Sequence, residues 1–569
     1  MEHKDLKSFR APSPLKMGKI RARGATIYSN AILVAALSGL IPYSALAANE
    51  LEGAEIKSIK IVNNNIFDEN SDDYTSLLSK GVNLLHIKTQ KEIIEKQLLF
   101  KVGDQFSEQK AEETERILRR NKYICDAKIY ATKVPQGVEI QVITSDTWST
   151  KPALSFGHTG GASKNEAGIE EDNLLGLGLS LSISYKQDAD RSATNFRLAD
   201  NYVFNSNHKI ELQRSNLSDG TFNSLLIEKP FISLDSRSSY RLNVNEYSRM
   251  ESRYHLGEKY VSFDRTDEEL ELNWGWSDGI SDDGVWRHSV GLQSRKARAT
   301  LSSVQPDLTD TAITSYVDSL QPEYEKREIY PYYAVNFLEN KYDKTINFDK
   351  IGRTEDRYLG TELGFQIGAG GSALGSSENF MRISGFANRN DAISRKIFLR
   401  SGFLLDGYYS IETGSFTDST FKYYSTLDIY QTNSFRFHSS FTGLEAYNWN
   451  YYSQLLVDED NGLRGYPRNF LSGDRIHNLS FEERYYSNLT LFGMFNFGAA
   501  VFMDVSRVSG GTEFEQQENG IYRSLGVGLR ISNNRSSSGE VIHLDLATPL
   551  DAAPDNNNYQ FSISAQSKF

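Results

Sequence analysis

Polar and apolar side chains alternate along residues 559–569, and this period of two constrains the fold more than any other feature of the chain. Successive side chains of a β-strand point to opposite faces, so the segment is predicted to be a strand with one apolar and one polar face. Such a strand suits the wall of a barrel that separates lipid from a wet lumen, although a strand of a β-sandwich shows the same pattern. The apolar face carries Tyr559, Phe561, Ile563, Ala565 and Phe569, and the polar face carries Gln560, Ser562, Ser564, Gln566 and Lys568.

The same alternation recurs from about residue 150 onward, for example in residues 179–185 and 363–367. Breaks rich in Gly, Asn, Asp and Ser separate the alternating runs and are predicted to be turns or loops. At about 26 residues for each strand with its connections, residues 150–569 are expected to form roughly 16 antiparallel strands. We expect the sheet to close, because an open strand edge in hydrocarbon would leave costly unpaired backbone groups.

The composition is compatible with a transmembrane β-barrel. The mean hydropathy is −0.48, and beyond the N-terminal region the chain has no run of about 18 apolar residues. Only alternate residues of a barrel strand face lipid, so the mean hydropathy stays low while aromatic residues gather at the membrane interfaces. The 31 Tyr and 31 Phe residues fit that pattern, but a Tyr-rich β-sandwich or propeller would fit it as well.

Residues 1–47 have the order of a secretion signal peptide. Basic residues between positions 16 and 23 precede the apolar run 31–41, and Ala45-Leu46-Ala47 supplies the small residues of a cleavage site. A membrane anchor is the alternative, but the run is about half as long as a spanning helix requires. Cleavage removes seven Lys/Arg and two Asp/Glu and changes the net charge from −12 to −17. An acidic chain of this kind is not expected to bind nucleic acid.

Residues 56–145 are predicted to form a small α/β domain with the order β-α-α-β-β. Thr89-Gln90-Lys91-Glu92 has the spacing of a capping box and is expected to open the first helix. Ser107 is expected to cap the second helix. Two alternating runs around Pro135-Gln136-Gly137 are expected to form a hairpin. The one cysteine of the chain, Cys125, lies in this region, so no internal disulfide can form.

This domain resembles a single POTRA domain. The resemblance rests on the element order, on residues 102–106 before the second helix, and on residues 118–124, which lead from that helix into a strand. Some other small α/β module is the alternative, because short motifs also arise by chance.

Several motifs resemble the BamA, TamA and FhaC superfamily of outer-membrane insertases and translocators, also called the bacterial surface antigen family. Each motif is weak by itself, and their order along the chain carries the resemblance. A last strand that ends on an aromatic residue, here with Tyr559, Phe561, Ile563 and Phe569, resembles the assembly signal of outer-membrane barrels. The matching segments are 171–178 (N-L-x-G-x-G first strand), 462–466 (R-G-Y loop), 473–474, 482–485, 498–504 (G-x-x-x-F-x-D strand), 526–530 and 544–550.

The R-G-Y loop motif comprises Leu463, Arg464, Gly465 and Tyr466, and the strand motif comprises Gly498, Phe502 and Asp504. A glycine allows a tight turn, and a cation away from bulk water needs an anion. The resemblance implies that Asp504 is the partner of Arg464, held by two parallel hydrogen bonds that tether the loop to the barrel wall. Ser506 departs from the family, which has Gly there more often, and this puts the local strand geometry in doubt. Two separately solvated charges are the alternative.

The resemblance implies a protein of the outer membrane, with the POTRA-like domain in the periplasm, that inserts or translocates polypeptide. Its expected partners are outer-membrane lipids, an unfolded polypeptide client and accessory periplasmic proteins or lipoproteins. A passive porin or structural surface antigen is one alternative, and a barrel-embedded hydrolase is another. We expect no enzyme activity, metal or cofactor, because the chain has no G-x-S-x-G, H-E-x-x-H or phosphate loop and its nine His residues do not cluster. A Ser-His pair assembled from distant strands remains open, as does the identity of the client.

Overall fold

The computed structural model describes residues 51–67, 77–152, 155–159, 162–203, 206–281, 284–305, 310–346, 354–533, 535, 541–551 and 559–566. Residues 51–569 form one compact unit. The predicted signal peptide, residues 1–47, lies outside the described residues, as does Phe569. None of the described helices is long and apolar enough to cross a membrane.

Residues 51–148 form a small α/β unit. Its elements are β1 (Ile56–Asn64), α2 (Leu77–Leu85), α3 (Lys91–Glu95), α4 (Glu108–Arg120), β2 (Ile124–Val134) and β3 (Gly137–Asp146). The sheet has the order β1-β3-β2, with β1 parallel and β2 antiparallel to β3. The two predicted helices and the final hairpin are present, and α2 is a further helix that the sequence reasoning missed.

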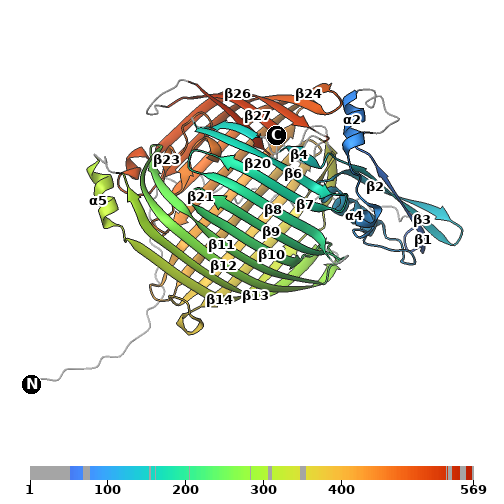
Figure 1. The fold of residues 1–569 in the computed structure, drawn as a ribbon, viewed down its shortest axis with the longest axis horizontal. Coiled ribbons are helices and arrows are strands. Elements are labelled where there is room, and N and C mark those ends of the chain that lie inside the picture. Colours follow the sequence, from blue (N-terminus) through green and yellow to red (C-terminus); the bar gives the residue numbers. More distant parts are fainter. Residues whose placement is uncertain are drawn as a thin grey trace, which may run out of the picture. The chain divides into compact units, whose positions relative to one another are not determined.

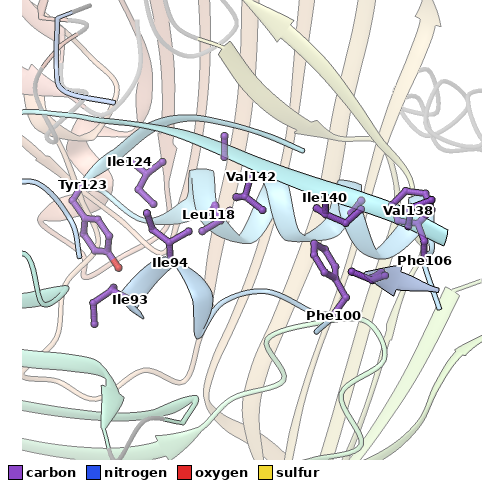
Figure 2. Packing of buried hydrophobic residues seen from close by; sticks show 13 residues of the cluster. Ile93, Ile94, Phe100, Phe106, Leu118, Tyr123, Ile124, Val138, Ile140 and Val142 are labelled. Carbon is purple, nitrogen blue, oxygen red and sulfur yellow. The ribbon is translucent and has the colours of Figure 1, made fainter. Parts of the chain in front are cut away.

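The core of the α/β unit is apolar because β1, α3, α4, β2 and β3 each direct apolar residues to it (Figure 2). Leu118 of α4 and Ile140 and Val142 of β3 are fully buried, and Ile94 of α3 packs into the same cluster. The alternation of β3 thus places its odd and even side chains on different faces, as the period of two requires.

The predicted capping box is wrong. Ser107 is the N-cap residue of α4 as expected, but its side chain makes no capping hydrogen bond. The N-cap of α3 is Gln90, because the Thr89 backbone N–H and hydroxyl both donate to the carboxylate of Asp146, at 2.7 and 3.0 Å. The Asp146 carboxylate is completely shielded from solvent. Thr89 therefore bonds to Asp146, which is distant in the sequence, and does not make the predicted capping contact within its own helix.

Twenty antiparallel strands close a barrel in the described residues (Figure 1). The expectation of roughly 16 strands was wrong because many connections are short: β18 and β19 are joined by residues 395–396 alone. β4 and β5 both pair with β6 and are two parts of the first strand. The strands are β4 (Thr150–Pro152), β5 (Ser155–Thr159), β6 (Ala162–Leu174), β7 (Leu179–Gln187), β8 (Ser192–Val203), β9 (His208–Leu217), β10 (Gly220–Lys229), β11 (Ser238–His255), β12 (Glu258–Ser281), β13 (Gly284–Val304), β14 (Glu323–Leu338), β17 (Gly360–Gly370), β18 (Phe380–Ser394), β19 (Ile397–Ser410), β20 (Ser415–Tyr430), β21 (Phe435–Tyr447), β24 (Arg475–Leu491), β25 (Phe495–Ser509), β26 (Gly520–Asn533), β27 (Val541–Pro549) and β28 (Gln560–Gln566).

Strands β26 and β28 illustrate an outward apolar face and an inward polar face of the barrel wall. In β26, Leu525, Val527 and Leu529 are 43%, 52% and 57% exposed, whereas Ser524 and Arg530 are fully buried in the lumen. In β28, Phe561 is 49% exposed and Ser562 is buried, as the predicted alternation requires of these two residues. The alternation therefore separates the two faces around the barrel.

Five connections carry further elements. Helix α5 (Thr311–Ser319) joins β13 to β14, and the hairpin of β15 (Tyr342–Ile346) and β16 (Thr354–Tyr358) joins β14 to β17. The connection between β21 and β24 holds a second small hairpin. The remaining short elements are η2 (Ser372–Leu374), β22 (Leu456–Val457), η3 (Glu459–Asn461), β23 (Leu471–Ser472) and η4 (Glu515–Glu518).

The segment that resembles a first-strand motif forms a turn at its center. β6 ends at Leu174 and β7 begins at Leu179, and Gly176 and Gly178 between them have φ angles of +74° and +70°. A Cβ atom on Gly176 would lie 2.4 Å from the Lys88 carbonyl oxygen. Glycine is required here by both the backbone angle and the close approach of the α/β unit.

Candidate functional site

The connection between β21 and β24, residues 448–474, folds into a packed structure of its own; we call it the lumen loop. β22 pairs with β23, and the side chain of Asp458 accepts hydrogen bonds from the backbone N–H groups of Asn461 and Asn469. Leu463 and Tyr466 are fully buried. Tyr466 also donates a hydrogen bond from its hydroxyl to the Arg523 carbonyl oxygen at 3.0 Å. The loop is therefore held by its own scaffold and by the barrel.

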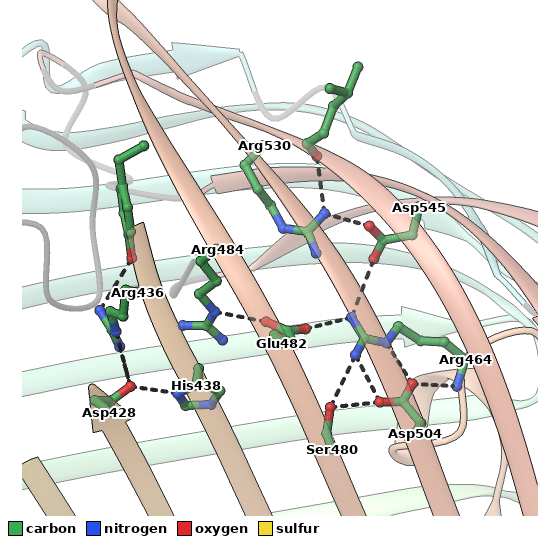
Figure 3. A network of polar contacts seen from close by, with 12 residues as sticks. Asp428, Arg436, His438, Arg464, Ser480, Glu482, Arg484, Asp504, Arg530 and Asp545 are labelled. Carbon is green, nitrogen blue, oxygen red and sulfur yellow. Dashed lines mark hydrogen bonds and ion pairs between the residues drawn. The ribbon is translucent and has the colours of Figure 1, made fainter. Parts of the chain in front are cut away.

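Arg464 of the lumen loop lies against Asp504 of β25 (Figure 3). Its Nε and Nη2 atoms donate to the two carboxylate oxygens of Asp504 at 2.7 and 2.8 Å. The Arg464 backbone N–H points to the same carboxylate at 3.3 Å. A planar guanidinium matches a carboxylate in this two-bonded geometry, which fixes orientation as well as distance.

Four further side chains complete the surroundings of Arg464. Its Nη1 donates to Glu482 Oε1 at 2.7 Å, and its Nη2 donates to Ser480 Oγ at 3.2 Å. The Asp545 carboxylate lies 3.8 Å from Nη1. The guanidinium carbon also lies 3.4 Å from the ring centroid of Phe502, which is buried. Arg464 is thus bound by three carboxylates and stacked on an aromatic face, and β24, β25 and β27 all take part.

Gly465 allows the loop to reach this position. Its φ is +87°, and a Cβ atom there would lie 3.0 Å from the Cβ atom of Ala547 in β27. Residues other than glycine rarely adopt this backbone conformation. Because the loop backbone at Gly465 lies close to β27, the adjacent side chains of Arg464 and Tyr466 both reach the barrel wall.

The ion network extends along the lumen beyond Arg464 (Figure 3). Glu482 also accepts from Arg484 Nε at 2.8 Å, and Asp545 also pairs with Arg530. In the neighboring strands, Asp428 accepts from Arg436 at 2.6 and 3.0 Å and contacts His438 Nδ1 at 2.6 Å. The wall that faces the lumen loop from β20 to β27 is therefore lined by paired charges.

The sequence-predicted residues fall into three groups in the structure. Arg464, Phe502 and Asp504 are in contact, while Leu463, Gly465 and Tyr466 hold the loop beside them. Gly498 lies farther along β25, in register with Tyr486 and Arg530. Tyr559 directly precedes β28, and Phe561 and Ile563 lie within it. Ser506, the departure from the motif, keeps regular register between Asn478 and Tyr522 and donates to Asn478 Oδ1 at 2.6 Å.

Sequence reasoning missed Ser480, Glu482 and Asp545 as partners of Arg464. Residues 482–485 and 544–550 were noted only as strand segments. The signal that reveals these residues is the period of two: Ser480 and Glu482 share the inward face of β24, and Asp545 is inward in β27.

The seam between the two ends of the barrel is the second notable feature. β27 and β28 pair along their length, from Val541 opposite Gln566 to Ala547 opposite Gln560. Across the seam, the described parts of β28 and β5 share a single register pair, Ile563 with His158. Gly157 lies at this crossing, where a Cβ atom would be 3.1 Å from the Ile563 carbonyl oxygen.

No protein-family model and no curated protein sequence matches the chain. Solved structures similar to it include CdiB from Escherichia coli, with 12% identity, a TM-score of 0.43, and coverage of 90% of this chain and 76% of that chain. CdiB from Acinetobacter baumannii has 14% identity and a TM-score of 0.41, with 90% and 73% covered. BamA from Haemophilus ducreyi lacking POTRA domains 1–3 has 11% identity and a TM-score of 0.39, with 90% and 85% covered.

Proposed function

We propose that this protein is an outer-membrane β-barrel that inserts or translocates polypeptide. The α/β unit, as a POTRA-like domain in the periplasm, recruits the client, and the barrel passes or templates it. The observation that carries the proposal is the lumen loop, which Arg464 tethers to Asp504 inside a closed barrel.

The two faces of the barrel wall support a place in a membrane. Outward side chains such as Val527 and Leu529 are apolar and exposed, and the described strands form a closed sheet. A closed barrel with an apolar outside is one of two structures that can span hydrocarbon without unpaired backbone groups.

The lumen loop supports transfer more than passive diffusion. A loop that is attached through several ion pairs blocks part of the lumen. In a lumen filled with water, these ion pairs can be replaced by contacts with water, so the loop can detach more readily than a loop held by apolar packing. The seam between β5 and β28, where Ile563 pairs with His158, joins the two ends of the barrel and is the edge at which we expect a client strand to enter. Main-chain hydrogen bonds at such an edge accept a strand with little regard to its sequence.

Replacement of Arg464 tests the proposal. We expect Arg464→Ala to leave a folded barrel but to reduce polypeptide transfer, because the loop loses its pairing with Asp504, Glu482 and Asp545. The assay reconstitutes the full chain in lipid vesicles and follows the assembly of a urea-unfolded test barrel by its heat-modifiable gel migration. Arg298→Ala is the matched control, because this exposed arginine pairs with Glu325 on the outer wall. Unchanged transfer by Arg464→Ala would contradict the shared mechanism.

A passive porin or surface antigen predicts a different result. Deletion of residues 56–145 would then leave ion conductance across a planar bilayer, and no transfer would be lost. Under the proposed function the same deletion abolishes transfer, because the client is no longer recruited.

A further inference from the structure

The strand order β1-β3-β2 makes β2 one of the two edge strands in the sheet of the α/β unit. In an antiparallel edge strand, alternate residues pair with the neighbor while the others direct their N–H and C=O groups outward. Ala127 and Ile129 are two residues apart, so their backbone groups point to the same side. A client strand that adds to β2 must bond to these groups.

Two side chains of α4 already occupy that edge. Arg119 Nη1 donates to the Ala127 carbonyl oxygen at 2.6 Å, and the Ile129 N–H donates to Glu115 Oε1 at 2.8 Å. Arg119 and Glu115 also contact each other at 3.3 Å across one turn of the helix. Their side chains are only 6% and 10% exposed. The helix therefore supplies one donor and one acceptor where a guest strand would supply its own.

The β15–β16 hairpin of the barrel holds both α4 side chains in place; we call it the latch hairpin. Lys344 Nζ lies 2.7 Å from Glu115 Oε2, and Asp356 accepts two hydrogen bonds from Arg119, each of 2.7 Å. Lys344 and Asp356 lie opposite each other in the hairpin register. A third contact places the Arg116 guanidinium 4.5 Å from the ring centroid of Tyr342. One face of the latch hairpin is thus complementary in charge to one face of α4.

We propose that the latch hairpin is an autoinhibitory element that keeps the β2 edge closed to client strands. This inference rests on the proposed function, since it assumes that the β2 edge receives an extended polypeptide. While Lys344 and Asp356 hold Glu115 and Arg119, the outward groups of Ala127 and Ile129 stay occupied. Release of the hairpin frees the two side chains to swing away, and a guest strand pairs with β2. The contacts of Lys344 and Asp356 are polar, and the Lys344 side chain is 53% exposed, so water can replace them when the latch opens.

The occupant is an extended segment with alternating polar and apolar residues. β2 spans 11 residues, which is the length of edge a guest strand can follow. The chain itself contains such a segment in residues 559–569, and a synthetic peptide of that sequence is the probe.

The test compares binding of the fluorescently labeled 559–569 peptide to the full-length protein in detergent micelles, measured by anisotropy. The double variant Lys344→Ala/Asp356→Ala removes the latch contacts and leaves α4 intact. Loss of two ion pairs of this kind should tighten peptide binding by about five- to thirty-fold. Hydrogen exchange at the Ile129 amide should also accelerate, because Glu115 is no longer held against it. Arg298→Ala/Glu325→Ala, which removes an exposed ion pair on the outer wall, is the matched control and should bind as the unmodified protein does.

A third variant, Ile129→Pro, removes the edge N–H and blocks strand addition. It should abolish peptide binding with and without the latch mutations. If the latch variant binds the peptide no more tightly, while Ile129→Pro still abolishes binding, the latch is refuted and strand recruitment stands. If no form binds the peptide, recruitment at this edge fails and the proposed function loses its first step. Binding that survives Ile129→Pro would show that β2 is not the site and would overturn the inference.

Discussion

The α/β unit and the barrel have opposite interiors. Leu118, Ile140 and Val142 are fully buried in an apolar core in the first, whereas Arg464, Asp504 and Glu482 meet in the lumen of the second. The α/β unit is stabilised by burying apolar side chains in a packed core. Under the proposed function, the outer face of the barrel transfers its apolar side chains from water into fluid lipid without a packed core, and paired charges line part of its interior. The same substitution should therefore have different effects in the two regions.

The largest effect is expected from truncating the apolar core. Leu118→Ala removes a fully buried side chain from α4 and should lower the free energy of unfolding of the α/β unit by about 2–5 kcal/mol. Leu529→Ala, the same change on the outer face of β26, should cost less, about 1–2 kcal/mol, because it loses transfer into lipid but leaves no cavity in a packed core. Denaturant titration checks both, with protease resistance reporting on residues 51–148 and gel migration reporting on the barrel. Equal losses at the two positions would break the comparison.

Two adjacent residues of β17 test the difference between the outward and the inward face of the barrel wall. Phe365 faces outward and is 47% exposed, while Gln366 lines a lumen cavity of about 370 Å³. Phe365→Arg should destabilise the barrel in lipid by about 2–4 kcal/mol, because it places a cation in hydrocarbon. Gln366→Arg should be tolerated in the polar cavity. Folding into vesicles at increasing urea concentration gives both values, and a tolerated Phe365→Arg would contradict the membrane placement of this face.

A smaller effect is expected where backbone conformation limits the lumen loop. Gly465→Ala should cost about 1–2 kcal/mol from the left-handed backbone alone, with a further cost from the contact with Ala547 at 3.0 Å. Gly414→Ala is the matched control, because its φ is +64° but the nearest atom would lie 3.9 Å away. Limited proteolysis within residues 448–474 should increase for Gly465→Ala alone. Equal cleavage in both variants would show that the close approach to β27 does not hold the loop.

The smallest effect concerns a carboxyl group of α4. Burial raises the pKa of Glu113, partly opposed by the hydrogen bond of 2.7 Å that its carboxylate accepts from the Leu234 N–H. An acid with a higher pKa in the folded state binds more protons there than in the unfolded state, so stability falls as pH rises above its ordinary value of 4.5.

We therefore expect the α/β unit to lose a small part of its free energy of unfolding between mildly acidic and neutral pH through Glu113. Glu113→Gln should remove this part of the pH dependence, and Glu112→Gln, on the exposed side of the same helix, should retain it. Denaturant titrations at several pH values measure the difference. A steeper fall for Glu113→Gln would reverse the assigned sign.

The sequence predicted the class of fold correctly but the number of barrel strands incorrectly. Alternation identified the strands of the barrel, and turn residues such as Pro135 and Gln136 identified the hairpin of the α/β unit. The count of strands depended on the lengths of the connections, which have no periodic signal. The capping box failed for a similar reason, since Asp146 lies far from Thr89 in the sequence but next to it in space.

The site was predictable only in part. Motif order brought Arg464 and Asp504 to attention, and the structure places them in contact. Glu482 and Asp545 belong to strands that the same reasoning had noted, yet nothing in either strand alone indicates Arg464 as a partner. The latch contacts of Lys344 and Asp356 with α4 had no sequence signal, because they join segments separated by more than 200 residues.

By itself the sequence determined which face of a strand each side chain takes, because the direction of a side chain alternates with every residue and needs no distant partner. The number of strands, the register of the seam and the set of charges around Arg464 were decided only by the tertiary structure. Closure of a barrel is a condition on all strands together, and an ion pair in the lumen exists only once that closure has set which strands stand side by side.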